Sequence, residues 1–114
     1  MGVSINLAAI MENVDDDEEL LKSIIQVFLD DSDTQLEAIE SASKSQDAKE
    51  LEIQAHTLKG SVSLFGVDEA WQKAYELEVR GKDANFDGVE ADVSLLQNYV
   101  SDIQAQLKEL SEKL

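Results

Sequence analysis

The sequence predicts an all-α protein, an antiparallel up-down four-helix bundle with a short extra helix at its N-terminus. Three observations lead to this prediction. The 114 residues contain no proline and only five glycines, and they are rich in residues that favour helix. Apolar residues recur at helical spacing through four long segments. The connections between these segments are short, which makes neighbouring helices antiparallel. Because a chain of this length is the usual size of one domain, we expect residues 1–114 to form a single domain.

The first two helices are expected in the N-terminal third of the chain. A short apolar helix is predicted from Ile5 to Met11. The stretch NVDDDEELL then has the pattern of a helix start, with Asp16 as the N-cap and Glu19 as its capping-box partner. The polar run DDSD interrupts the apolar spacing of the second helix. Its apolar positions recur at helical spacing: Leu21, Ile24, Ile25, Phe28, Leu36 and Ile39.

The third helix follows a turn in the stretch SKSQDA. Asp47 is its predicted N-cap and Glu50 the capping-box partner. This helix is expected to run to about Phe65, where Gly66 ends it.

The fourth and fifth helices complete the expected bundle. The fourth begins near Asp68 and ends near Gly81, and the stretch GKDANFDG forms a loop. The last helix then carries apolar residues at alternating spacings of three and four up to the end of the chain. These residues are Val89, Val93, Leu96, Val100, Ile103, Leu107, Leu110 and Leu114.

The charge of the chain narrows the choice of partners. Twenty-five acidic residues against nine basic ones give a net charge of −16. Such a surface repels phosphate backbones, so nucleic acid and anionic membranes are excluded as expected partners. We find no apolar run long enough to span a membrane and no signal peptide. The absence of cysteine fits a reducing, cytoplasmic setting, and a monomer is expected.

The stretch HTLKGSVSLFG contains the only histidine of the chain, His56, and a glycine four residues later. Glycine within a helix costs roughly 0.5–1 kcal/mol relative to alanine. Each helical residue advances by roughly 100°. His56 therefore lies on the opposite side of its helix from a narrow apolar stripe, and we expect it on the outer surface. The stripe consists of Leu51, Ala55, Leu58, Val62 and Phe65.

The helical phase argues against a core histidine but leaves an incidental surface histidine possible. Gly60 and Ser63 remove bulk beside the ring, and Lys59 places a cation next to it. Helix stability does not explain this combination, whereas the approach of an anionic molecule to the imidazole does. Because imidazole is a nucleophile near pH 7, the group suits a covalent phosphohistidine. Trp71 and Tyr75 are interpreted as packing residues.

The stretch AHTLKGSVSLFG resembles the signature of histidine-containing phosphotransfer (HPt) domains. That pattern has a histidine, an apolar residue two positions later, then Lys-Gly-Ser, and a glycine ten residues after the histidine. The downstream stretch AWQKAYELE is similar to the next helix of the family, which typically ends in Leu-Glu before a glycine. The resemblance extends over nearly the whole chain. The matching residues are His56, Leu58, Lys59, Gly60, Ser61, Gly66, Leu77, Glu78 and Gly81.

The resemblance implies a role for each residue of the signature. His56 would accept a phosphoryl group on Nε2 from an aspartyl phosphate of a response-regulator receiver domain, and would pass it to another receiver. Lys59 would lie by the phosphoryl oxygens, and Gly60 would let the receiver close over the ring. The long polar side chain that the facing helix often offers would be Glu78 or Lys82. Glu78 is assigned no role in binding phosphate, because its charge repels it.

The partners implied are receiver domains and a sensor or hybrid histidine kinase. The chain has no nucleotide-binding signature and no metal-site spacing, so we expect no cofactor or kinase activity here and Mg²⁺ on the receiver. The candidate receiver-docking residues are Glu52, Ile53, Thr57 and Leu64, and for the last three, packing against a neighbouring helix is the alternative.

Three other functions remain open at this point. The chain could be a non-catalytic helical interaction module in which His56 is incidental. It could be the phosphoacceptor domain of a histidine kinase, in which case only the donor differs. A hydrolase that uses the acids and His56 is disfavoured, because no paired-carboxylate or Ser/His/acid arrangement is visible.

Overall fold

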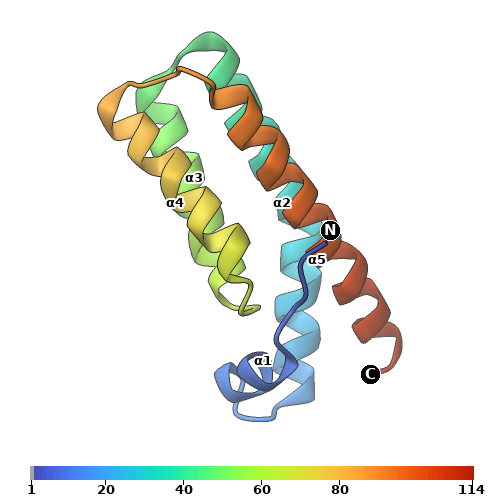
Figure 1. The fold of residues 1–114 in the computed structure, drawn as a ribbon. Coiled ribbons are helices and arrows are strands. Elements are labelled where there is room, and N and C mark those ends of the chain that lie inside the picture. The colour runs from blue at the N-terminus through green and yellow to red at the C-terminus, as the bar shows by residue number, and fades with distance from the viewer. Residues whose placement is uncertain (1) are drawn as a thin grey trace.

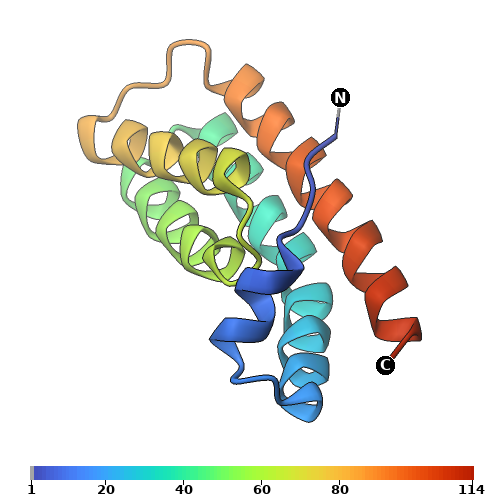
Figure 2. The same cartoon turned by 60° about the horizontal axis from the view of Figure 1, so that its bottom comes forward.

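The fold is an all-α bundle, as predicted. A computed structural model describes residues 2–114, and these residues contain five helices and no strand. Four long helices run alternately up and down, and α1 lies across one end of them (Figures 1 and 2). Each long helix contacts the next, and α5 contacts α2, so the ring of helices closes. The bounds are α1 Leu7–Asn13, α2 Glu18–Ser45, α3 Ala48–Ser63, α4 Asp68–Asp83 and α5 Val89–Glu112.

The N-terminal helix begins two residues later than predicted. Asn6 is its N-cap, and the Asn6 side chain accepts a hydrogen bond from the backbone N–H of Ala9. The backbone N–H of Asn6 also donates to the carbonyl of Phe65 at 3.0 Å, which joins this end of the chain to the end of α3. Ile5 therefore precedes the helix, and Met11 lies within it.

The N-cap predicted for α2 was wrong, but the long second helix is confirmed. Asp17, and not Asp16, caps the helix, because Asp15 and Asp16 have left-handed backbone conformations and Asp17 accepts from the first free N–H groups. The helix also continues through the polar run DDSD. Its three aspartates face solvent, and only Ser32 faces the core, where its hydroxyl accepts a hydrogen bond from Gln104 on α5. A small side chain with a polar partner leaves the helix uninterrupted.

The N-cap predicted for α3 is confirmed. The Asp47 side chain accepts a hydrogen bond from the backbone N–H of Glu50 at 3.1 Å. The Glu50 side chain accepts from Gln54 instead of completing a capping box. Gly66 follows α3 with a φ of +67°, in the left-handed region that glycine tolerates best.

The end of α4 was predicted too early. The helix continues through Gly81 to Asp83, and Ala84 takes the left-handed C-cap conformation. Gly81 is where α4 and α3 pack most closely: a Cβ atom there would lie 2.5 Å from the backbone nitrogen of Glu52. This glycine therefore permits the close approach of the two helices and does not end α4.

The core forms from the apolar stripes of the four long helices together with residues from α1 and the connections. The stripe predicted on α3 is confirmed, since each of its members is fully buried: Leu51, Ala55, Leu58, Val62 and Phe65. Phe28 of α2 packs edge-on against Phe65 with ring centroids 5.0 Å apart. The buried stripe fixes the rotation of α3 and thereby the direction of its outer residues.

No helix within residues 2–114 has the length and apolar character needed to cross a membrane.

Candidate phosphotransfer site

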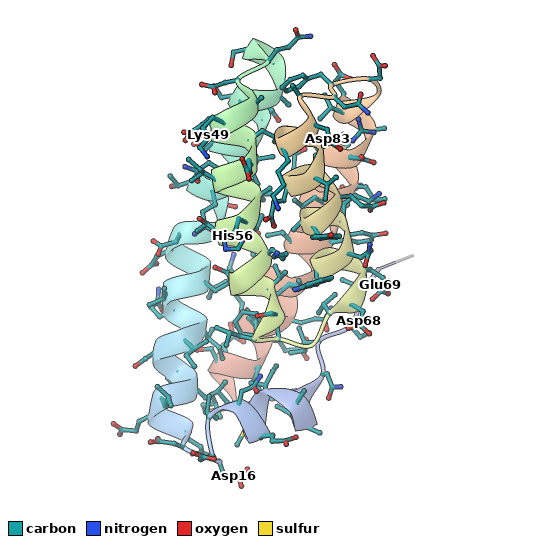
Figure 3. All side chains as sticks on the ribbon, turned by 90° about the vertical axis from the view of Figure 1, so that its left-hand side faces the viewer. Asp16, Lys49, His56, Asp68, Glu69 and Asp83 are labelled. Atoms are coloured by element: carbon teal, nitrogen blue, oxygen red, sulfur yellow. The ribbon has the colours of Figure 1, made fainter. Side chains whose placement is uncertain are left out.

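His56 projects from the outer surface of α3, about half-way along the helix (Figure 3). Its side chain is 66% exposed. The prediction that the ring faces away from the core is therefore confirmed. Its neighbour Ala55 is fully buried, and this step of one residue is enough to move a side chain from the core to the surface.

A buried carboxylate from the facing helix holds one nitrogen of this ring. Oε2 of Glu78, on α4, lies 3.1 Å from Nδ1 of His56, and the Glu78 side chain is only 8% exposed. Burial alone would raise the pKa of Glu78, but Lys59 and His56 outweigh it and leave this pKa below its usual value. The group is therefore an anion at neutral pH.

The charge of Glu78 determines which ring nitrogen carries the proton. An ionised carboxylate only accepts hydrogen bonds, so Nδ1 of His56 must donate. The neutral imidazole then has its proton on Nδ1 and its free lone pair on Nε2, which points away from Glu78. Glu78 was expected on the facing helix, but its contact with His56 was not predicted. The sequence signal for Glu78 was its place in the Leu-Glu pattern before Gly81.

Lys59 lies beside His56, as predicted, and contacts the same carboxylate. Its Nζ is 2.8 Å from Oε1 of Glu78, and its side chain is 17% exposed. The angles at Oε1 do not meet hydrogen-bond geometry, so the contact is best described as an ion pair. Glu78 thus bridges the imidazole with one oxygen and the ammonium with the other.

Gly60 leaves open space one turn after His56, because a Cβ atom there would have no neighbour within 4 Å. Ser63 is exposed, and its hydroxyl donates to the carbonyl of Gly60 at 2.6 Å. Both residues keep bulk away from the outer surface of α3.

Replacing Gly60 with alanine should stabilise the fold and slow phosphoryl transfer. Alanine favours the helix by roughly 0.5–1 kcal/mol and meets no neighbour. The added methyl group would obstruct a partner that approaches the ring, and we expect transfer about tenfold slower. Thermal unfolding and single-turnover transfer rates check this prediction.

A matched control is Ser41→Ala, on the exposed surface of α2, which raises helix propensity without adding bulk near His56. Equal transfer rates for Gly60→Ala and Ser41→Ala would contradict an access role for Gly60.

The surface around His56 forms a shallow hollow of about 350 Å³ between α3 and α4. Three candidate docking residues, Glu52, Ile53 and Thr57, line it together with His56. Glu52 is paired with Lys49 at 3.7 Å, and Ile53 is 44% exposed. The hollow is further lined by Lys49, Glu78 and Lys82.

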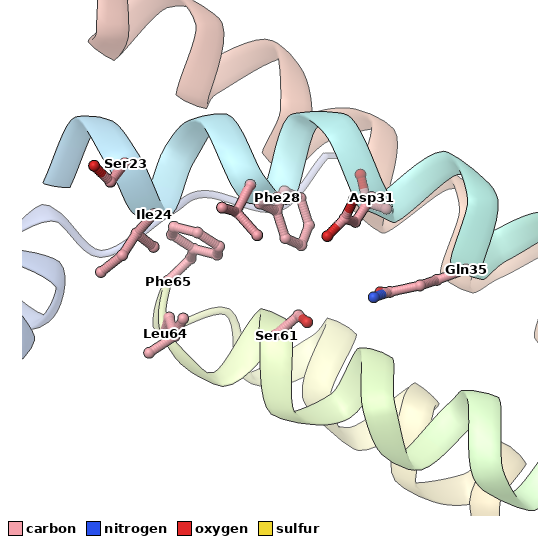
Figure 4. A pocket seen from close by; sticks show the side chains of 10 residues that line it. Ser23, Ile24, Phe28, Asp31, Gln35, Ser61, Leu64 and Phe65 are labelled. Atoms are coloured by element: carbon pink, nitrogen blue, oxygen red, sulfur yellow. The ribbon is translucent and has the colours of Figure 1, made fainter. Parts of the chain in front are cut away.

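Leu64, the fourth candidate docking residue, lies in a different hollow. This second hollow, of about 220 Å³, is mainly apolar and lies between α2 and the end of α3 (Figure 4). Ser61 and Leu64 come from the α3 side, and Ile24 and Phe28 from α2. The structure therefore does not bring Leu64 together with the residues that surround His56.

The acids of the site do not form a metal-binding cluster. Within residues 2–114, no group of three or more histidine, cysteine or acidic residues is placed to hold a metal ion. Glu78 has its two oxygens occupied by His56 and Lys59.

Substituting Glu78 with glutamine should remove a pH-dependent part of the stability. Because the folded-state pKa of Glu78 lies below its unfolded-state value of about 4.3, the ionised group stabilises the fold above that pH. This stabilisation is lost as the pH falls through the lower folded-state value. We therefore expect the free energy of unfolding of the wild type to exceed that of Glu78→Gln by about 1–3 kcal/mol at pH 7, and by less at pH 3.

Denaturant unfolding of both proteins between pH 3 and pH 7 measures this difference. Glu76→Gln is a suitable control, because Glu76 lies two residues away on the exposed side of α4. A difference that stays constant over this pH range would show that folding does not lower the pKa of Glu78, and would contradict the prediction.

The bundle and this site define a class of protein: a helical domain that presents one oriented, solvent-exposed histidine on a long helix. The sequence model of the Hpt domain family matches residues 23–113, so the chain belongs to the Hpt domain family. Hpt domains are phosphotransfer intermediates of phosphorelays and not catalytic kinases. No curated protein matches the chain.

Two solved structures share the fold. One is histidine-containing phosphotransfer protein B (HptB) from Pseudomonas aeruginosa PAO1, with a TM-score of 0.89 and 18% identity over 96% of each chain. The other is the HPT domain of a sensor hybrid histidine kinase from Shewanella, with a TM-score of 0.83 and 18% identity. That match covers 96% of this chain and 95% of the other. These likenesses confirm the bundle architecture.

Proposed function

We propose that His56 accepts a phosphoryl group on Nε2 from the aspartyl phosphate of a receiver domain and passes it to the aspartate of another receiver. One observation carries this proposal. Nδ1 of the only histidine is held by a buried anion, while Nε2 faces solvent beside open space at Gly60. A neutral ring with a fixed, outward lone pair is the arrangement that an in-line attack on phosphorus requires.

The proposed step is a direct displacement at phosphorus. The lone pair of Nε2 forms the N–P bond while the bond from phosphorus to the aspartyl oxygen breaks, and the receiver regains its carboxylate. The ring keeps the proton on Nδ1 and so gains positive charge. Glu78, 3.1 Å from Nδ1, stabilises that charge, and the reverse step returns the ring to its neutral form.

Lys59 and the receiver would neutralise the phosphoryl oxygens. Lys59 lies next to the ring through its shared partner Glu78, so its ammonium places positive charge beside an incoming phosphoryl group. Phosphoryl transfer generally needs a metal ion, and we assign Mg²⁺ to the receiver because the acids of this chain form no such site within residues 2–114.

A receiver would dock on the exposed side of α3 and on the adjoining part of α2. Ile53 and Thr57 line the hollow beside His56, and Leu64 lines the separate apolar hollow against α2. Exposed apolar side chains next to a reactive group are typical of a protein interface. Glu52 lies at the edge of this surface, where its charge would influence the choice of partner.

A histidine kinase as direct donor is the second candidate. The same exposed Nε2 would accept the γ-phosphoryl group of ATP in the active site of a separate kinase domain. A receiver partner is favoured by the exposed apolar side chains of Val27 on α2 and Ile53 on α3 and by the apolar hollow between the two helices.

The experiment is a test of donors. The domain is incubated with Mg²⁺ and each of a set of phosphorylated receivers, and separately with histidine kinases and ATP. Label that moves from a receiver to an acid-labile, alkali-stable bond on the domain supports the proposal and identifies the partner. Label that comes only from a kinase supports the second candidate. If no donor labels the domain, the proposal is wrong and an interaction module takes its place.

A further inference from the structure

Two aromatic side chains beside the site are more exposed than packing residues should be. Trp71 and Tyr75, both on α4, are 37% and 40% exposed. Their rings stack on each other with centroids 5.5 Å apart and planes 15° apart. This corrects the interpretation that they are ordinary packing residues. Since much of each ring remains in water, burial in the core does not account for their position.

The stacked rings lie under the ammonium group of Lys59. Nζ is 5.5 Å from the centroid of Trp71 and 5.2 Å from that of Tyr75. Both distances fall within the roughly 6 Å over which an aromatic face attracts a cation. Glu78 follows Tyr75 by three residues, so the rings and the carboxylate occupy one side of α4 and all face Lys59.

This arrangement restrains a side chain that is normally mobile. A lysine on a helix surface samples many rotamers, whereas Lys59 is held by two ring faces and a carboxylate. The restraint matters for His56 because the same carboxylate binds Nδ1. If Lys59 moved away, Glu78 would lose a cation that lowers its pKa, and the phosphoryl group would lose a neighbouring positive charge.

We propose that Trp71 and Tyr75 are positioning residues whose stacked rings hold the Lys59 ammonium against Glu78, beside His56, and thereby speed phosphoryl transfer. The proposal rests on the proposed function of His56. It assigns to the rings no contact with the phosphoryl group and none with the receiver. Their effect should therefore fall on the rate of the transfer step and not on the affinity for the partner.

The test compares variants that keep or remove the ring faces. Tyr75→Phe and Trp71→Phe retain an aromatic face, whereas Tyr75→Leu and Trp71→Leu do not. For the double leucine variant we expect kcat of transfer to fall roughly 3- to 30-fold, equivalent to about 0.7–2 kcal/mol, with KM for the receiver unchanged. The phenylalanine variants should retain most of the rate. Thermal unfolding verifies that each variant is folded.

A second measurement follows the restraint without any phosphoryl transfer. In the wild type, the ε-methylene protons of Lys59, assigned by their loss in Lys59→Met, should resonate upfield of those of exposed lysines because of the ring currents. This shift should be reduced in the double leucine variant and retained with phenylalanine.

Two results would overturn the inference. A higher KM with unchanged kcat in the leucine variants would make the rings a contact surface for the partner. Lys59 resonances at the position of exposed lysines in the wild type would mean that the rings do not hold the ammonium. If the proposed function itself is wrong, the result is different. No donor then labels even the wild type, although the Lys59 protons keep their upfield shift.

Discussion

Replacing His56 with glutamine should abolish phosphoryl transfer and change the stability of the fold by no more than about 0.5 kcal/mol. The side chain is mostly exposed, and its polar contact is with Glu78. A glutamine amide still donates a hydrogen bond to that carboxylate, but its nitrogen has no lone pair available for attack on phosphorus. Transfer of label from the phosphorylated receiver, together with denaturant unfolding, measures both effects.

The chain contains a single histidine, which makes the result of this experiment unambiguous. Because His56 is the only histidine, any acid-labile, alkali-stable label that remains on His56→Gln must lie on another residue type. Such a label would contradict the assignment of the phosphoacceptor. Glu78→Gln serves as the matched comparison: it retains the histidine, so it should transfer more slowly than the wild type but still measurably.

The second large effect is expected at Gly81, where α4 packs against α3. In Gly81→Ala, the new Cβ would lie 2.5 Å from the backbone nitrogen of Glu52 and 2.8 Å from the carbonyl oxygen of Ala48. Backbone atoms cannot move aside as a flexible side chain can, so α3 and α4 must separate. We expect the free energy of unfolding to fall by about 1–3 kcal/mol, although alanine favours a helix more than glycine does. We also expect a weaker contact between His56 and Glu78.

Gly60→Ala is the control for Gly81→Ala. The two glycines lie in neighbouring helices, and the same substitution is made at each. Gly60→Ala adds a methyl group in open space and should raise the unfolding temperature, whereas Gly81→Ala should lower it. A rise for both variants would show that α3 and α4 do not need the close approach seen at Gly81.

The parts of the site that depend on helical periodicity could be predicted from the sequence. The apolar stripe of α3 determines which side of the helix is buried, and this alone places His56 outside and Lys59 and Gly60 next to it. The N-cap of α3 could be predicted because Asp47 acts on its own segment of chain, whereas the helix ends at Ser63, two residues before the predicted end near Phe65.

The parts that depend on contacts between helices could not be predicted in this way. The bond from His56 to Glu78 needs the register of α3 against α4, which is set by the packing at Gly81. Ser32 belonged to a polar run that interrupts the apolar spacing, and its burial could not be predicted because its partner, Gln104, is distant in sequence. The setting of Lys59 between Glu78 and the stacked rings likewise comes from two helices, and no local pattern encodes it.

The most direct test of the central claim is an NMR spectrum of the domain with ¹⁵N-labelled histidine, before and after phosphorylation. The single histidine gives one set of ring signals, free of overlap. We predict a proton on Nδ1 before the reaction, and phosphorus bonded to Nε2 with Nδ1 still protonated afterwards. Phosphorus on Nδ1, or an unchanged ring in a protein that has taken up label, would contradict the account.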